Sequence, residues 1–155
     1  MALTTLGNTA FGTSSVVSAA IKDNAVIYNK LDANTAHVDR NQSFSVAQRG
    51  SISDQGVKAA GTVTLNLNTA NYYSFTVNGN ITLANPTNTT AGQAGALFMT
   101  ANGSYTTSFG SHWRFPTGTA PTMSTSAGKV DRIDYVVQSA NTIHAIATID
   151  LLGTA

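Results

Sequence analysis

The feature that most constrains the fold of this chain is the alternation of apolar and polar residues from Asn41 onward. Residues 62–67 and 72–77 both place an apolar side chain at every second position. Successive side chains of a strand point to opposite faces, so this pattern predicts strands with one buried and one wet face. About eight to ten such short segments follow one another, and the residues 94–100 are more continuously apolar, as expected of a central strand.

Turn signals separate these segments. Asn-Gly pairs at 78–79 and 102–103 each predict a hairpin between the alternating runs on either side. The clearest pair of strands is 132–138 and 143–151, with a turn at Asn141. No segment is long enough to form the crossover helices of a parallel α/β fold. We therefore expect an all-β fold, specifically an antiparallel β-sandwich or jelly roll.

Composition excludes several function classes. Only 10% of the residues are charged, against about 25% in ordinary soluble domains, and the net charge is +1. This balance provides no basic field for nucleic acid. Without cysteine, the chain has no disulfide, thiolate zinc site or cysteine nucleophile. No apolar run approaches the roughly 20 residues of a membrane span, and no signal-peptide pattern opens the chain. We therefore expect neither a membrane partner nor a signal peptide.

Residues 1–40 do not alternate, and we expect them to form an extended N-terminal arm with short helical segments, followed by a β-domain over 41–155. Helices this short are marginal alone in water. A flexible leader is one interpretation. The other, which we favour, is an arm that becomes ordered against a partner, because disordered tails carry few large apolar residues. The candidate partner-binding residues are Leu3, Leu6, Phe11, Val16, Val17, Ile21, Ile27, Tyr28 and Leu31.

The chemistry-bearing residues form no recognisable catalytic or metal site. His37, His112 and His144 are dispersed, whereas a metal site needs ligands that converge. The run 112–114 (His-Trp-Arg) could stack a sugar or base, but alternation favours a strand with Trp113 and Phe115 in the core and the arginine outside.

Asp131 and Asp134 are the one close carboxylate pair of the β-region. Three residues apart on a strand, they point to opposite faces and cannot act together in glycoside hydrolysis. We expect surface ion pairs or an intersubunit contact. The chain also lacks a nucleophile elbow, a P-loop and a dinucleotide fingerprint. The sequence thus predicts no enzyme, no catalytic residue, no cofactor and no metal.

Several segments, in this order and spacing, are similar to a known group of proteins. They are 41–50 (NQSFSVAQRG), 64–67 (TLNL), 80–88 (NITLANPTN), 92–95 (GQAG), 110–115 (GSHWRF), 120–125 (APTMST) and 131–137 (DRIDYVV). Together they resemble a β-domain that recurs in tailed-bacteriophage structural proteins. Residues 19–26 and 29–31 resemble linker repeats found upstream of such modules in phage fibres. The resemblance implies a jelly-roll-like domain, often trimeric, used in head decoration, head fibres or tail fibres, with no catalytic residues.

A small domain with one arm suits a shell better than a distant receptor. The resemblance therefore suggests a capsid decoration (cement) protein on the outside of the phage head. Its partners would be the major capsid protein and two further copies in a homotrimer, and its location the capsid surface of the virion. The alternative is a fibre or receptor-binding module that recognises a host-surface glycan through the polar loops 87–93 and 116–126. An enzyme such as a depolymerase is disfavoured, because the chain has few acids and no glutamate.

Overall fold

The computed structural model describes residue 47 and residues 49–151 of the chain. Residues 1–40, for which an arm with short helical segments is predicted, and all nine candidate partner-binding residues lie outside this range. The elements are β1 (Ile52–Lys58), β2 (Gly61–Val63), β3 (Tyr72–Val77), β4 (Ile81–Leu83), β5 (Ala94–Ala101), β6 (Thr107–Phe109), β7 (Trp113–Arg114), the 3₁₀ turn η3 (Pro116–Gly118), β8 (Val130–Ser139) and β9 (Thr142–Leu151). The predicted β-rich fold is confirmed for the described residues.

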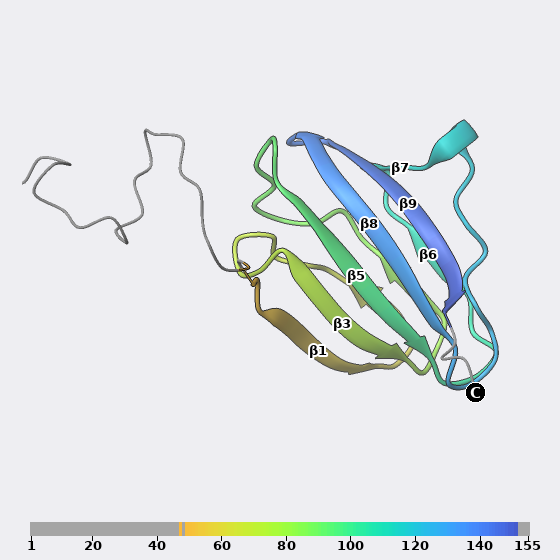
Figure 1. Cartoon of the computed structure of the whole chain (residues 1–155). Coiled ribbons are helices and arrows are strands. Elements are labelled where there is room, and N and C mark those ends of the chain that lie inside the picture. The colour runs from red at the N-terminus through yellow and green to blue at the C-terminus, as the bar shows by residue number, and fades with distance from the viewer. Residues whose placement is uncertain (1–46, 48, 152–155) are drawn as a thin grey trace, which may run out of the picture. The chain divides into compact units, whose positions relative to one another are not determined.

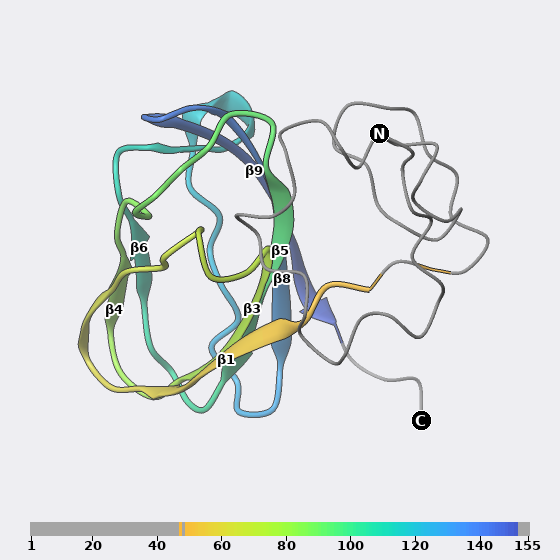
Figure 2. The ribbon, with the colours of Figure 1, turned by 90° about the vertical axis from the view of Figure 1, so that its left-hand side faces the viewer.

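The strands form two sheets. The larger has the order β1-β3-β5-β8-β9-β7, and the smaller has the order β2-β4-β6. Four strands of the larger sheet, β1, β3, β5 and β8, lie side by side in Figure 1. In Figure 2 the smaller sheet faces the larger one across the interior of the domain.

Pairing within the sheets is mostly parallel, so the predicted antiparallel jelly roll is wrong in this respect. Among the described strands, the parallel pairs are β1-β3, β3-β5, β2-β4, β4-β6 and β7-β9. The antiparallel pairs are β5-β8 and β8-β9. The chain passes from β1 to β3, and from β3 to β5, through a strand of the smaller sheet. It passes from β2 to β4, and from β4 to β6, through a strand of the larger sheet, whereas β7 and β9 are joined through β8 of their own sheet. A turn plus a short strand thus provides the crossover that we had expected only a helix to provide. The result is three stacked coils, each contributing one strand to each sheet.

The two Asn-Gly turns illustrate this correction. Neither closes a hairpin, since each leads from the larger sheet into the smaller one. The turns stack on each other instead: Asn78 N donates to Lys58 O, and Asn102 Nδ2 donates to Asn78 Oδ1 at 3.1 Å. A Cβ on Gly79 would lie 2.3 Å from Ala60 N in the coil below. Glycine is therefore needed here for close backbone approach between coils.

The C-terminal hairpin is confirmed. β8 and β9 pair antiparallel, and Ser139 opposite Thr142 closes the turn. Because β8 also pairs with β5, the hairpin extends the larger sheet beyond the last coil. Among the described residues, no helix is long and apolar enough to cross a membrane.

The core lies between the two sheets, and the predicted burial pattern is confirmed. The buried large side chains come from every second position of the strands and from the return loops. They include Val63, Leu65, Leu67, Tyr73, Phe75, Val77, Ile81, Leu83, Leu97, Met99, Trp113, Met123, Ile133, Tyr135, Val137 and Ile143. The predicted alternation at the aromatic strip also holds: Trp113 is buried, Arg114 is exposed and Phe115 packs against the core.

Candidate functional site

His112 and His144, the two histidines that the structure describes, belong to no group of three potential metal ligands. No group of three potential metal ligands occurs in the described part of the chain. His144 Nε2 lies 2.9 Å from Gln138 Oε1 on the neighbouring strand, and His112 is half-buried. His37 lies outside the described residues. Trp113 cannot serve as a stacking platform, because its ring is in the core and its indole N–H donates to Ala84 O at 3.0 Å.

The two aspartates of β8 have different roles, and one differs from expectation. Asp134 is a surface residue that pairs with Arg132 at 2.9 Å, as predicted. Asp131 is buried, not a surface group. It accepts hydrogen bonds from Ser124 N and Ser124 Oγ, each at 2.6 Å, and from Asp150 N at 2.8 Å. A buried carboxylate with three donors is a structural anchor that holds the loop after η3 against the end of β9.

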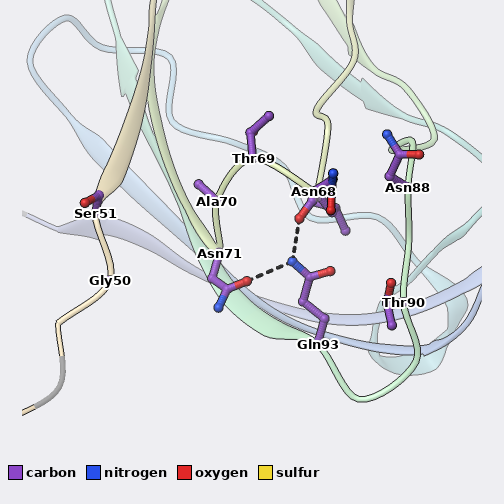
Figure 3. Close-up of a pocket in the computed structure, with 10 residues that line it drawn as sticks. Gly50, Ser51, Asn68, Thr69, Ala70, Asn71, Asn88, Thr90 and Gln93 are labelled. Carbon is purple, nitrogen blue, oxygen red and sulfur yellow. Dashed lines mark hydrogen bonds between the residues drawn. The ribbon is translucent and has the colours of Figure 1, made fainter. Parts of the chain in front are cut away.

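A polar hollow lies where two return loops meet, one between β2 and β3 and the other between β4 and β5. We call it the amide pocket. It has a volume of about 640 Å³ and is lined by Gly50, Ser51, Leu67, Asn68, Thr69, Ala70, Asn71, Asn88, Thr90 and Gln93 (Figure 3). Ligand pockets measure roughly 300–1,000 Å³, so this one could hold a small molecule. Every polar side chain in the lining is an amide or a hydroxyl, and none is charged.

Backbone and side-chain bonds join the two loops. Leu67 N donates to Thr87 O at 3.0 Å, and Thr87 N donates to Leu65 O at 2.9 Å. Beside this ladder, Asn88 Nδ2 donates to Asn66 Oδ1 at 2.8 Å, one coil below. The pocket is thus built on stacked coils whose backbone groups are paired, which makes its shape largely fixed before any ligand binds.

Two buried tyrosines hold the first loop from inside the core. The Tyr73 hydroxyl shares its proton between Asn66 O at 2.6 Å and Ala70 O at 2.8 Å. The Tyr135 hydroxyl donates to Asn71 O at 2.9 Å. Burial, followed by the proximity of Tyr73 and Tyr72, raises the pKa of Tyr135 above its ordinary value, so this hydroxyl remains a donor.

Gly95 of β5 allows the loop to lie this close. Asn71 O also accepts from Ala96 N at 3.1 Å, which brings the loop backbone against the start of β5. A Cβ on Gly95 would lie 1.8 Å from Asn71 O and 2.6 Å from the Tyr135 hydroxyl. No side chain larger than hydrogen fits there while Asn71 keeps its place.

The orientation of two amides in the pocket follows from chemistry alone. Gln93 Nε2 donates to Leu67 O at 2.7 Å and to Asn71 Oδ1 at 2.8 Å (Figure 3). A backbone carbonyl only accepts, so the nitrogen of Gln93 must face Leu67. Gln93 Oε1 is then left as an acceptor and Asn71 Nδ2 as a donor, each in a fixed position.

A second feature is the outer face of the larger sheet, which carries exposed apolar side chains. We define the outer face by Ile52, Val57, Tyr72, Val136 and Ile146, whose exposure ranges from 37% to 65%. A shallow hollow of about 650 Å³ on this face lies between Tyr72, Phe115 and Ile146. Large apolar residues exposed together on one face indicate an interaction surface.

Comparison with known proteins assigns no family. No family model matches the chain, and neither the curated proteins nor the solved structures give a significant match.

Two loops, 87–93 and 116–126, are the sequence-based candidates for glycan recognition. The loop 87–93 lines the amide pocket through Asn88, Thr90 and Gln93, and the loop 116–126 does not. The partner loop, with Asn68, Thr69 and Asn71, was missed. The sequence does carry one signal for this loop, since asparagines such as Asn66 and Asn88 recur at about the length of one coil. Stacked coils place equivalent residues side by side, so this repeat indicates that the two loops meet.

Proposed function

We propose that the protein is a virion structural protein that decorates the outside of a phage head, as a trimer, and stabilises contacts between major capsid subunits. The resemblance of its segments to phage structural modules motivates this function. The structural observation that carries it is the outer face, where a sheet backed by a buried core exposes apolar side chains from β1, β3, β8 and β9. Such a surface suits lasting contact with another protein.

The surface chemistry also fits a protein held in an assembly. Thr, Ser and Asn provide hydrogen-bonding groups at little charge, and burying neutral groups in an interface costs less than burying ions. The described surface therefore offers neutral hydrogen-bonding groups, beside the exposed apolar side chains of the outer face, for contact with another protein.

The mechanism would be mass action. A ligand that binds the assembled shell but not its separated subunits stabilises the shell, by about 2.7 kcal/mol at a concentration one hundred times its dissociation constant. Three arms linked in one trimer would raise the effective concentration once the first has docked. The nine candidate residues of 1–40 would make the contacts with the major capsid protein.

Co-sedimentation with capsids that lack the protein tests this function. The intact chain should bind and raise the temperature at which the capsids disassemble. A chain without residues 1–40 should keep its β-type circular dichroism spectrum and lose capsid binding, because the apolar contacts of the arm are gone. In the intact chain, Val17→Asp should weaken binding, whereas the control Thr13→Asp should not. Capsid binding by the truncated chain would refute the role of the arm.

One observation favours the alternative, a fibre or receptor-binding module. The loop 87–93, a candidate for glycan recognition, lines a pre-formed polar pocket. Adsorption of the isolated protein to host cells, together with failure to bind capsids, would favour this function over decoration.

A further inference from the structure

We propose that the amide pocket is a binding site for a neutral saccharide, with Gln93, Asn68 and Thr90 contacting its hydroxyl groups. This inference deepens the receptor-binding alternative, since it names the site and the ligand chemistry, and a decoration protein could carry the same site. Saccharide binding in solution tests the pocket, and the location of the protein on the virion tests its role. The saccharide site and the receptor-binding function can therefore be refuted separately.

The lining of the amide pocket matches the hydrogen-bonding chemistry of a neutral sugar. A sugar hydroxyl both donates and accepts, and amides and hydroxyls offer both functions side by side. The pocket presents Gln93 Oε1 as an acceptor, while Asn68 and Thr90 add an amide and a hydroxyl from the two loops. Because no lining residue is charged, the pocket offers nothing that would favour a phosphate, a sulfate or an acidic sugar.

The acceptor Gln93 Oε1 is oriented before any ligand binds. The two bonds donated by Gln93 Nε2 fix the plane of this half-buried amide, so its Oε1 cannot rotate away. In Figure 3, Oε1 points away from Asn71, on the side where Thr90 lies. An amide that already donates through its nitrogen is also a better acceptor through its oxygen, because hydrogen bonds in a chain polarise one another. Pre-oriented groups lose little entropy on binding.

Two of the three side chains proposed to contact the ligand, those of Asn68 and Thr90, are not used to hold the fold. The side chains of Asn68 and Thr90 make no hydrogen bond to another described residue, and both are exposed. Other amides of the same two loops do bond internally, as Asn66 does with Asn88 and Asn71 with Gln93. The loops thus separate into residues that build the pocket and residues that are available to a ligand.

The experiment uses the intact chain and a panel of neutral oligosaccharides built from glucose, mannose, galactose and N-acetylglucosamine, with sialylated and sulfated oligosaccharides for comparison. Binding is measured on an array and then by calorimetric titration of the best neutral binder. We expect binding to at least one neutral saccharide, with little dependence on salt because no ion pair forms. The side-chain amide signals of Gln93 and Asn68 in NMR spectra should shift on addition of that saccharide.

The matched variants are the double variant Asn68→Ala/Thr90→Val and the control Thr62→Val. Thr62 is an exposed threonine of β2 outside the pocket. The double variant should fold normally, and its affinity for the saccharide should fall by a factor of about ten or more, because two hydrogen bonds are lost. The control should bind as the unchanged protein does. The proposal is overturned if no neutral saccharide binds at millimolar concentration, if only acidic saccharides bind, or if the folded double variant binds as tightly as the control.

Discussion

The buried carboxylate of Asp131 allows a sharp test of how this fold is held together. Asp131→Asn keeps the size of the side chain but replaces one accepting oxygen by a donating NH₂ group. Oδ2 accepts from Ser124 N, and Oδ1 accepts from Ser124 Oγ and Asp150 N. In either orientation the new NH₂ therefore faces a backbone N–H, and a buried donor loses its partner.

The magnitude follows from these contacts. A hydrogen bond to a charged acceptor contributes about 1.5–3 kcal/mol, and a buried donor left without a partner costs about 1–3 kcal/mol. Asp131 is 2% exposed, so water cannot replace the lost acceptor. We expect Asp131→Asn to lower the free energy of unfolding by about 3 kcal/mol, which corresponds to a drop in melting temperature of roughly 10 °C.

The same substitution at Asp134 is the matched control, on the same strand three residues away. Its carboxylate is 47% exposed, and within the described part of the chain it pairs with Arg132 alone. Exposed pairs of this kind contribute about 0–1 kcal/mol. Urea denaturation of both intact variants, followed by circular dichroism, measures the difference. If the two variants unfold within about 1 kcal/mol of each other, the role that we assign to Asp131 is wrong.

Two further predictions concern the loop beneath the amide pocket. Gly95→Ala places a methyl group within 1.8 Å of Asn71 O, so we expect overpacking to lower the free energy of unfolding by at least about 2 kcal/mol. The control Ala94→Gly, on the same strand, should lower the free energy of unfolding by less. Equal losses measured by urea denaturation would contradict the close approach. The raised pKa of Tyr135 means that the folded state favours the protonated hydroxyl. The hydroxyl therefore stabilises the fold fully below the ordinary tyrosine pKa of about 10, and this stabilisation is lost as the pH rises above that value. Between pH 9 and 11, unfolding free energy should fall more steeply in the unchanged protein than in Tyr135→Phe, and parallel pH profiles would show that Tyr135 does not titrate in this way.

Much of the burial in this domain could be predicted from sequence, and the prediction failed where distant residues meet. Tyr73, Phe75 and Val77 are buried as their alternation indicated, and Trp113 is in the core. Asp131 was assigned to the surface, because a carboxylate is rarely buried without partners. Its partners, Ser124 and Asp150, lie 7 and 19 residues away in the chain, and nothing in the local pattern marks them.

The sequence by itself determined which residues form strands, where the chain turns and which side chains face the core. These properties depend on a period of two, which is local and is the same whatever strand lies alongside. Only the tertiary structure decided that the strands of the coils pair in parallel, that the Asn-Gly turns stack instead of closing hairpins, and that two return loops meet as the amide pocket. Such pairings depend on contacts between residues some 20 or more positions apart, and backbone hydrogen bonds leave no signature in the order of the side chains.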